Sequence, residues 1–144
     1  MSARKLILKG RAVTRGKVQG EVVVTSQPFM FAHGLDPKTG LIIDKRHELF
    51  GTKIKGKIFV FPFNIGSTTG GAWLLEAVRL KNAPSALVLE EKIDSVLATG
   101  VILSELFFHT VIPVVDELGP SVINLLHPAE IVEVNAENGI VLKI

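Results

Sequence analysis

The sequence predicts a mixed α/β fold, with strands towards both ends of the chain and alternating strands and helices between them. Two observations lead to this prediction. Short runs rich in Val, Ile and Leu lie near both termini, and in the middle short apolar runs alternate with stretches whose apolar residues recur at helical spacing. The length of 144 residues fits one domain. We therefore expect residues 1–144 to form a single α/β domain.

The first third of the chain predicts two strands and a long loop. Residues 6–13 and 17–25 are rich in Val, Ile and Leu and are interrupted by Gly10, Gly16 and Gly20, which predicts two strands joined by a tight turn. Residues 26–47 show no sustained period, so we predict a loop, with a short strand at residues 40–44. A structureless loop of this length is uncommon in a compact domain unless it is functional or disordered. This one is too apolar for disorder, so we expect a functional loop.

The remaining elements follow from the spacing of the apolar residues and from the residues that interrupt or bound each run. Apolar runs predict strands at residues 57–62, 85–90 and 111–115, whereas helical spacing predicts helices at residues 72–80 and 94–107, the second with Asp94 or Ser95 as its N-cap. Residues 122–126 predict a helical turn, and residues 130–135 and 140–144 predict a hairpin about Asn138-Gly139.

Composition and charge exclude several classes of function. The chain has no Cys, which excludes disulfides, thiolate zinc sites, a cysteine nucleophile and an iron–sulfur cluster ligated by its own thiolates. Its net charge of +2 is too small to favour nucleic acid as a partner. The most apolar window, residues 96–115, contains polar residues and a proline, so we expect no membrane partner. The first nine residues lack the features of a signal peptide, and we expect a cytoplasmic protein.

A glycine-rich segment, residues 66–71, lies between a predicted buried strand and a predicted helix. Backbone N–H groups at such a turn, together with the helix dipole, bind a carboxylate or phosphate, and Ser67, Thr68 and Thr69 add three hydroxyls. The segment matches neither a Walker A loop nor a dinucleotide fingerprint. The alternative is structural, with one hydroxyl capping the helix and the glycines making the turn. Spacing alone leaves both readings open and favours the structural one.

The long loop also carries four residues that suit a metal ion. His33, Asp36, Asp44 and His47 combine two imidazoles with two carboxylates. However, Asp36-Pro37-Lys38-Thr39-Gly40 is a good turn sequence, in which the Asp36 side chain would bond to its own backbone. We favour the turn and expect no metal site in this chain.

Taken together, these two segments resemble a known family. The pattern Gly-x-Asp-Pro-x-Thr-Gly with Asp-x-x-His at residues 34–47, followed by Gly-Ser-Thr-Thr-Gly at residues 66–70, is similar to that of the small, swivel-domain subunit of the aconitase X family. The resemblance extends from Leu6 to Asp116. One departure is Gly71, where many relatives have another small polar residue.

The resemblance implies a fold, a partner and an activity. It implies a swivelling β/β/α domain that pairs with a larger subunit, whose own cysteines bind a 4Fe–4S cluster, so that no cofactor is bound by this chain. The activity implied is that of a hydro-lyase of the archaeal modified mevalonate pathway, which dehydrates (R)-5-phosphomevalonate to trans-anhydromevalonate 5-phosphate.

The resemblance also assigns roles to particular residues. Ser67 is implied to be the base that abstracts the substrate proton. Around it, we expect Gly66, Thr68, Thr69 and Gly70 to bind the substrate. We expect Asp36, Asp44 and His47 to belong to a loop at the subunit interface or the active-site mouth.

Two other functions remain open at this point. The same scaffold serves cis-3-hydroxy-L-proline dehydratases in bacteria, and a non-catalytic anion-binding module would use the same glycine-rich segment. The absence of Cys and the presence of only two Gln (Gln19 and Gln27) are typical of thermophiles, which favours the archaeal role.

Overall fold

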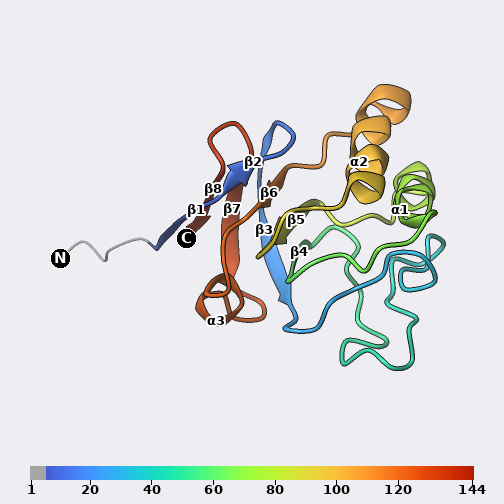
Figure 1. Ribbon diagram of the computed structural model, residues 1–144, viewed down its shortest axis with the longest axis horizontal. Coiled ribbons are helices and arrows are strands. Elements are labelled where there is room, and N and C mark those ends of the chain that lie inside the picture. The colour runs from blue at the N-terminus through green and yellow to red at the C-terminus, as the bar shows by residue number, and fades with distance from the viewer. Residues whose placement is uncertain (1–5) are drawn as a thin grey trace.

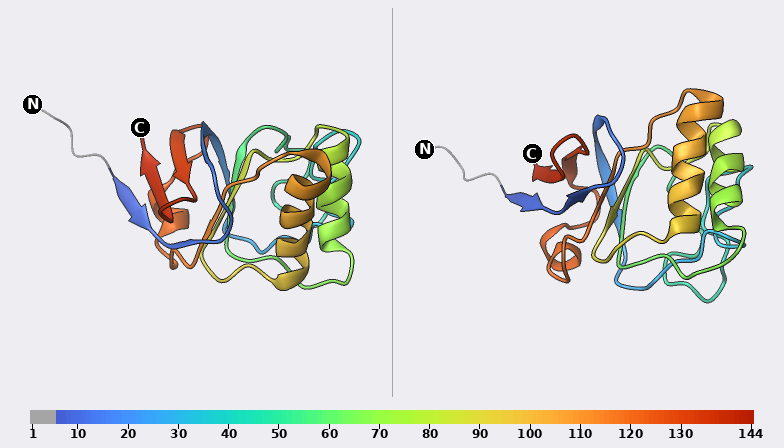
Figure 2. Two further views of the ribbon diagram at one scale, coloured as in Figure 1. Left: turned by 90° about the horizontal axis from the view of Figure 1, so that it is seen from above. Right: turned by 45° about the horizontal axis from the view of Figure 1, so that its top comes forward.

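The chain is arranged in three layers in a computed structural model, which describes residues 6–144 (Figure 1). Helices α1 (Gly70–Arg79) and α2 (Ser95–Phe108) cover one face of a parallel sheet, and Figure 2 shows them side by side. Antiparallel strands and the short helix α3 (Val122–Leu125) lie on the other face. The mixed α/β fold predicted from the sequence is confirmed. The first five residues of the segment tested for a signal peptide lie outside the described range.

Within residues 6–144, eight strands form one sheet around a parallel centre. They are β1 (Ile7–Lys9), β2 (Arg11–Ala12), β3 (Lys17–Val24), β4 (Ile58–Phe61), β5 (Ala86–Leu89), β6 (Val114–Asp116), β7 (Ile131–Asn135) and β8 (Ile140–Lys143). Their order across the sheet is β1-β8-β7-β3-β4-β5-β6-β2. Strands β3 to β6 are parallel, whereas β1, β8 and β7 on one side and β2 on the other are antiparallel to their neighbours. The predicted hairpin of β7 and β8 is confirmed.

The central strands are buried on both faces, as their continuous apolar runs predict. In β4, Phe59 and Phe61 point into a core beneath the helices, while Ile58 and Val60 point into a second core shared with β7 and β8. Strand β5 alternates in the same way, so each central strand joins the two cores. This double burial fixes the position of the loops that leave the carboxyl ends of the strands.

The first predicted strand is wrong in one respect, because Gly10 splits it in two. Strand β1 pairs with β8 and β2 pairs with β6, at opposite edges of the sheet, so the sheet curls round until its edges meet. The crossing is tight: a Cβ on Gly10 would lie 2.3 Å from the carbonyl oxygen of Asp116. The Gly10 N–H also donates to the carbonyl of Gly139 at 2.8 Å. Only glycine fits between these two segments.

The long loop after β3 packs into the core. Four of its apolar side chains are almost wholly buried: Phe29, Phe31, Leu35 and Ile42. Phe29 makes an edge-to-face contact with Phe59 of β4, with ring centroids 5.2 Å apart. The predicted strand at residues 40–44 is wrong, because this segment makes only isolated bridges. The apolar composition therefore reflects a loop that extends the helix-side core.

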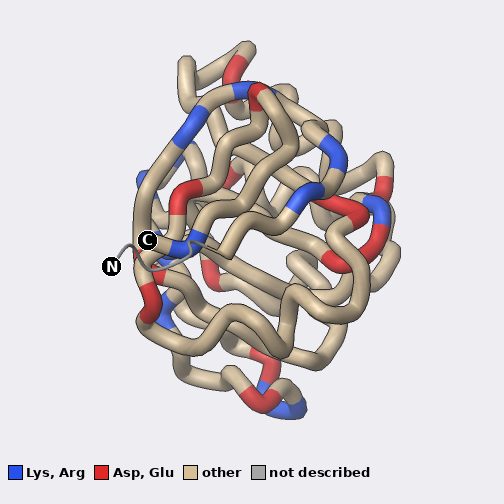
Figure 3. The backbone as a smooth tube through the Cα atoms, turned by 90° about the vertical axis from the view of Figure 1, so that its left-hand side faces the viewer, with Lys and Arg blue, Asp and Glu red and all other residues tan. Residues whose placement is uncertain are grey.

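Charged residues of both signs are interspersed on the side of the molecule that carries the C-terminus (Figure 3). Several pair with each other, as Lys57 does with Glu21 and Lys143 does with Glu130. In the part of the chain that the structure describes, no helix has the length and apolar character needed to cross a membrane.

Candidate functional site

The glycine-rich segment lies at the carboxyl edge of the parallel strands. It follows β4 and leads into α1, and the chain that leaves β5 leads into α2 in the same way. Because both connections are strand–helix crossovers, the two helices begin at the same edge of the sheet. Ligands of open α/β sheets bind at this edge. The segment therefore occupies the position expected of a binding or catalytic site.

Ser67 lies just before the first turn of α1. Its Oγ accepts a hydrogen bond from the backbone N–H of Thr69 at 3.4 Å, and it lies 3.4 Å from the point where a Cβ on Gly70 would be. Ser67 is half-buried, whereas Gly66 is exposed, and a Cβ on Gly66 would have no atom of the described residues within 4 Å. The serine hydroxyl is thus accessible yet held over the start of a helix.

The start of α1 lacks the side-chain cap that the structural reading requires. The helix begins at Gly70, two residues earlier than predicted, and its N-cap is Thr69. Within residues 6–144, the Thr69 side chain makes no capping hydrogen bond, and no acidic residue occupies the first turn. The N–H groups of a first helical turn have no partner inside the helix. They remain available for an anionic ligand.

Gly71, the departure from the family pattern, has a structural reason. A Cβ on Gly71 would lie 2.3 Å from the carbonyl oxygen of Val96 in α2, and a Cβ on Gly100 would lie 2.4 Å from the carbonyl oxygen of Gly71. The backbones of α1 and α2 are thus in direct contact at this crossing. The contact holds the N-terminus of α1, and with it Ser67, at a defined position beside α2.

Sequence reasoning gave no role to Asn64, which the structure places at this site. Its side chain is 7% exposed, and its Nδ2 donates a hydrogen bond to Asp94 Oδ2. Asp94, one of the two residues predicted for this position, is the N-cap of α2, and its Oδ1 accepts from the Leu97 N–H at 2.8 Å. The signal in the sequence was a polar residue that lies three positions after the end of β4 and two before Gly66.

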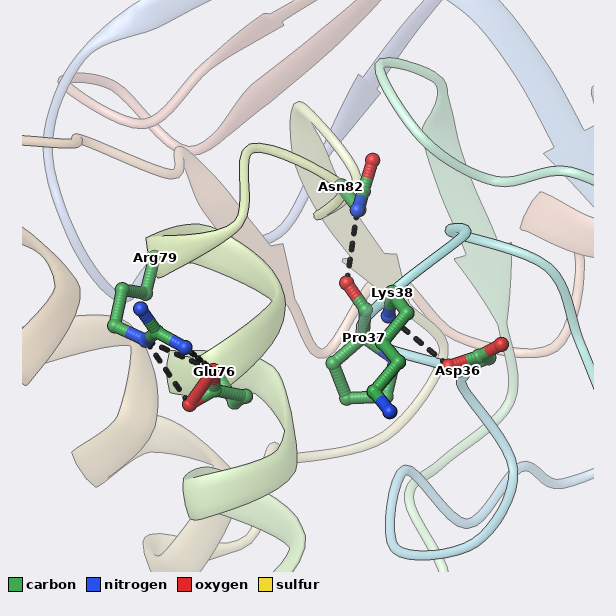
Figure 4. Close-up of polar contacts among 6 residues, drawn as sticks. All are labelled: Asp36, Pro37, Lys38, Glu76, Arg79 and Asn82. Carbon is green, nitrogen blue, oxygen red and sulfur yellow. Dashed lines mark hydrogen bonds and ion pairs between the residues drawn. The ribbon is translucent and has the colours of Figure 1, made fainter.

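The turn at residues 36–40 forms as predicted from its sequence. Asp36 Oδ1 accepts from the Lys38 N–H and Oδ2 accepts from the Thr39 hydroxyl, each at 3.0 Å. Asn82, which follows α1, donates from Nδ2 to the carbonyl of Pro37 at 2.9 Å (Figure 4). The turn is thereby fastened beside α1.

An open groove of about 910 Å³ lies between this turn and α1. Asp36 and Ile43 line it from the loop, and Thr69 lines it next to the glycine-rich segment. On the helix side, Glu76 and Arg79 form an ion pair (Figure 4). The hydrogen bond from Arg79 holds the pKa of Glu76 below its ordinary value. The groove thus brings Asp36 and the glycine-rich segment to one continuous surface.

Asp44 and His47 serve the internal structure of the loop. Asp44 Oδ1 accepts from the Arg46 N–H at 2.9 Å. His47 is 8% exposed, its Nδ1 accepts from the Leu49 N–H at 3.0 Å, and its ring meets Phe29 edge to face at 5.5 Å.

The four residues considered as metal ligands do not form a site. Throughout residues 6–144, no three His, Asp or Glu side chains are grouped so that they could hold a metal ion. The carboxylates of Asp36 and Asp44 instead bond to the backbone of their own turns.

Comparison with known proteins agrees with the resemblance seen in the sequence. The family described as the aconitase X swivel domain matches residues 7–143. The phosphomevalonate dehydratase small subunit of Methanosarcina acetivorans is 37% identical over 132 residues, covering 92% of this chain and 87% of the relative. The corresponding small subunit of Thermococcus sibiricus is 39% identical over 132 residues, covering 92% and 94%. The crystal structure of Thermococcus kodakaraensis aconitase X in its holo-form superposes with a TM-score of 0.86 at 34% identity, covering 96% of this chain and 98% of that one. The chain therefore belongs to the aconitase X swivel domain family.

Proposed function

We propose that this chain is the small subunit of a phosphomevalonate dehydratase, with residues 1–144 acting as one swivel domain in the cytoplasm. The complex would dehydrate (R)-5-phosphomevalonate to trans-anhydromevalonate 5-phosphate. One observation carries the proposal: Ser67 stands at the uncapped N-terminus of α1, in a chain that matches small subunits of that name over nine-tenths of its length.

In this proposal Ser67 is the base that removes the proton from the carbon next to the substrate carboxylate. A serine hydroxyl is a weak base, so its deprotonated form must be stabilised. The backbone N–H groups of residues 66–70 and the dipole of α1 supply that stabilisation from fixed positions. Gly66 and Gly70 let the backbone approach the substrate, and the hydroxyls of Thr68 and Thr69 are placed to bind its anionic groups.

The second requirement of dehydration is a Lewis acid for the departing hydroxide, which a 4Fe–4S cluster supplies when it is bound. This chain has no Cys, and the described residues offer no set of metal-binding side chains. We therefore assign the cluster to a large subunit. The relatives' designation as small subunits implies such a partner.

We propose that the large subunit covers the surface around the long loop. Ile43 and Phe50 on the loop and Ile65 beside Ser67 are large apolar side chains that are 40% to 53% exposed. A contiguous patch of exposed apolar side chains marks a protein interface, and we propose that these three side chains belong to one. Asp36, at the groove, would then lie at the active-site mouth, whereas Asp44 and His47 would act by holding the shape of the loop.

The test is Ser67→Ala in the complex reconstituted with its large subunit and loaded cluster. Loss of a general base should lower kcat by about 10²–10⁴, or about 3–5 kcal/mol at the barrier, while the complex still assembles. Thr68→Ala and Thr69→Ala are matched controls that should retain much more activity. If Ser67 were only a helix-start residue, its loss would lower stability by about 1 kcal/mol and leave turnover almost intact.

The same reconstitution tests the partner and the substrate. The isolated chain should be inactive, and full activity without a large subunit would contradict the proposal. The complex should turn over (R)-5-phosphomevalonate. Turnover of cis-3-hydroxy-L-proline in its place would show that the scaffold serves the other dehydratase of the family.

A further inference from the structure

We propose that Asn64 is a positioning residue for Ser67, presenting one amide N–H to the serine oxygen. The inference rests on the proposed role of Ser67 as the base. Asn64 Nδ2 and Ser67 Oγ both approach Gly70: a Cβ on that glycine would lie 3.8 Å from the first and 3.4 Å from the second. Both groups therefore face the same point at the start of α1.

The orientation of the Asn64 amide is determined by Asp94. A carboxylate only accepts hydrogen bonds, so the amide nitrogen must face Asp94 Oδ2 and the amide oxygen must face away. Asp94 is in turn held by the Leu97 N–H at the start of α2. The Nδ2 group thus keeps one N–H on Asp94 and has a second N–H free for another acceptor.

The buried Asn64 side chain is otherwise poorly explained by stability. Its Oδ1 is buried and has no hydrogen-bond partner among residues 6–144. A buried polar atom without a partner is rare in folded proteins and destabilises them. A role for the remaining N–H explains why an amide occupies this position.

The catalytic consequence follows from where charge develops. The Ser67 oxygen carries negative charge when it is ready to accept a proton, and fixed N–H donors stabilise that state without having to reorganise. In the present rotamer Oγ has only a long contact with the Thr69 N–H, at 3.4 Å. Serine side chains move between staggered rotamers, and we assign the Asn64 N–H as the donor of the catalytic one.

The test compares Asn64→Ala with the reciprocal variant Asn64→Asp/Asp94→Asn, both in the reconstituted complex. The single change should lower kcat by about 10²-fold, the effect of removing one such donor, and leave KM within about threefold. It should also move the rising limb of the pH–kcat profile to higher pH, because the serine loses a donor that favours its charged form.

The reciprocal variant distinguishes a role of Asn64 in positioning Ser67 from a purely structural hydrogen bond between positions 64 and 94. An amide at 94 can donate to a carboxylate at 64, and Asn is also a good N-cap, so the thermal midpoint should return towards that of the wild type. The carboxylate now beside Ser67 offers no N–H, so kcat should stay low. If Asn64→Ala prevents assembly, normal kcat in an assembled reciprocal variant overturns the inference.

Other outcomes overturn the inference in distinguishable ways. Recovery of both stability and kcat in the reciprocal variant would show that Asn64 is only a tie between the loop and α2. A normal kcat and pH profile for Asn64→Ala, with Ser67→Ala inactive, would reject the role of Asn64 and leave Ser67 as the base. Normal turnover by Ser67→Ala would contradict both the role of Ser67 as the base and the role of Asn64 in positioning it.

Discussion

Substitution of Gly71 by Ala should damage catalysis more than stability. The new Cβ would lie 2.3 Å from the Val96 carbonyl oxygen and 3.3 Å from the Gly100 Cα, and both are backbone atoms that cannot rotate away. Helix α1 must therefore retreat by about 1 Å to reach ordinary van der Waals contact. Overpacking of this kind costs about 1–3 kcal/mol, and the better helix propensity of Ala offsets about 1 kcal/mol of that.

The effect on turnover follows from the same displacement. The N-terminus of α1 moves with the helix, and a misplacement of about 1 Å in a catalytic group costs about 10²-fold in rate. The thermal midpoint should fall by no more than about 8 °C, since each kcal/mol shifts it by about 2–4 °C in a domain of this size. Circular dichroism of the isolated chain and kcat of the complex measure the two effects.

A matched control is Gly20→Ala in β3. There the new Cβ would meet side-chain atoms at ordinary contact distances, Ile58 Cδ1 at 3.4 Å and Ser85 Oγ at 3.8 Å, so stability and turnover should stay near those of the wild type. Full activity of Gly71→Ala in the complex would refute the reasoning, because it would show that the crossing of α1 and α2 does not hold Ser67 in place.

Two further predictions concern charged groups away from the site. Arg11 donates from Nε and Nη2 to the two carboxylate oxygens of the wholly buried Asp116, at 2.9 and 2.7 Å. The substitution Arg11→Met leaves this buried carboxylate without its ion-pair partner. It should lower the free energy of unfolding, measured in urea, by about 3 kcal/mol. An unchanged free energy of unfolding would contradict this role of Arg11. Burial, with a smaller contribution from Glu91, raises the pKa of Glu90 above its ordinary value. The folded state therefore holds this proton more tightly than the unfolded chain, and stability falls as pH rises from the ordinary carboxyl pKa through the raised one. Glu90→Gln should make the protein more stable than the wild type above that window and no different below it; equal pH–stability curves would contradict this.

Local patterns in the sequence predicted the elements well because each depends on neighbouring residues. The run that became β4 is buried on both faces, and Asp94 caps α2 as its position before a helical pattern indicates. The split at Gly10 was not predictable in this way, since it depends on Asp116 and on Gly139, both more than 100 residues further along the chain.

At the site, too, local features were predictable from the sequence, whereas contacts between distant segments were not. The motif around Ser67 is contiguous and can be recognised in the sequence. The meeting of Gly71 with Gly100 and the bond from Asn64 to Asp94 join segments about 30 residues apart in the chain, on two different crossovers. Nothing in either segment alone specifies its partner. The positioning of the serine therefore depends on packing that only the folded structure brings together.

These contacts form a connected path from the edge of the sheet to the serine. Arg11 in β2 holds Asp116 in β6, and Asp116 Oδ2 also accepts from the Ile93 N–H at 2.8 Å, directly before Asp94. Asp94 then holds Asn64 at the start of the serine loop. Closure of the curled sheet at β2 thereby fixes where α2 begins, and α2 fixes where Ser67 stands. If the proposed complex closes to bring Ser67 to a substrate on a large subunit, we therefore expect a rigid-body movement of the whole domain, the kind of transition in which packed units rotate without repacking.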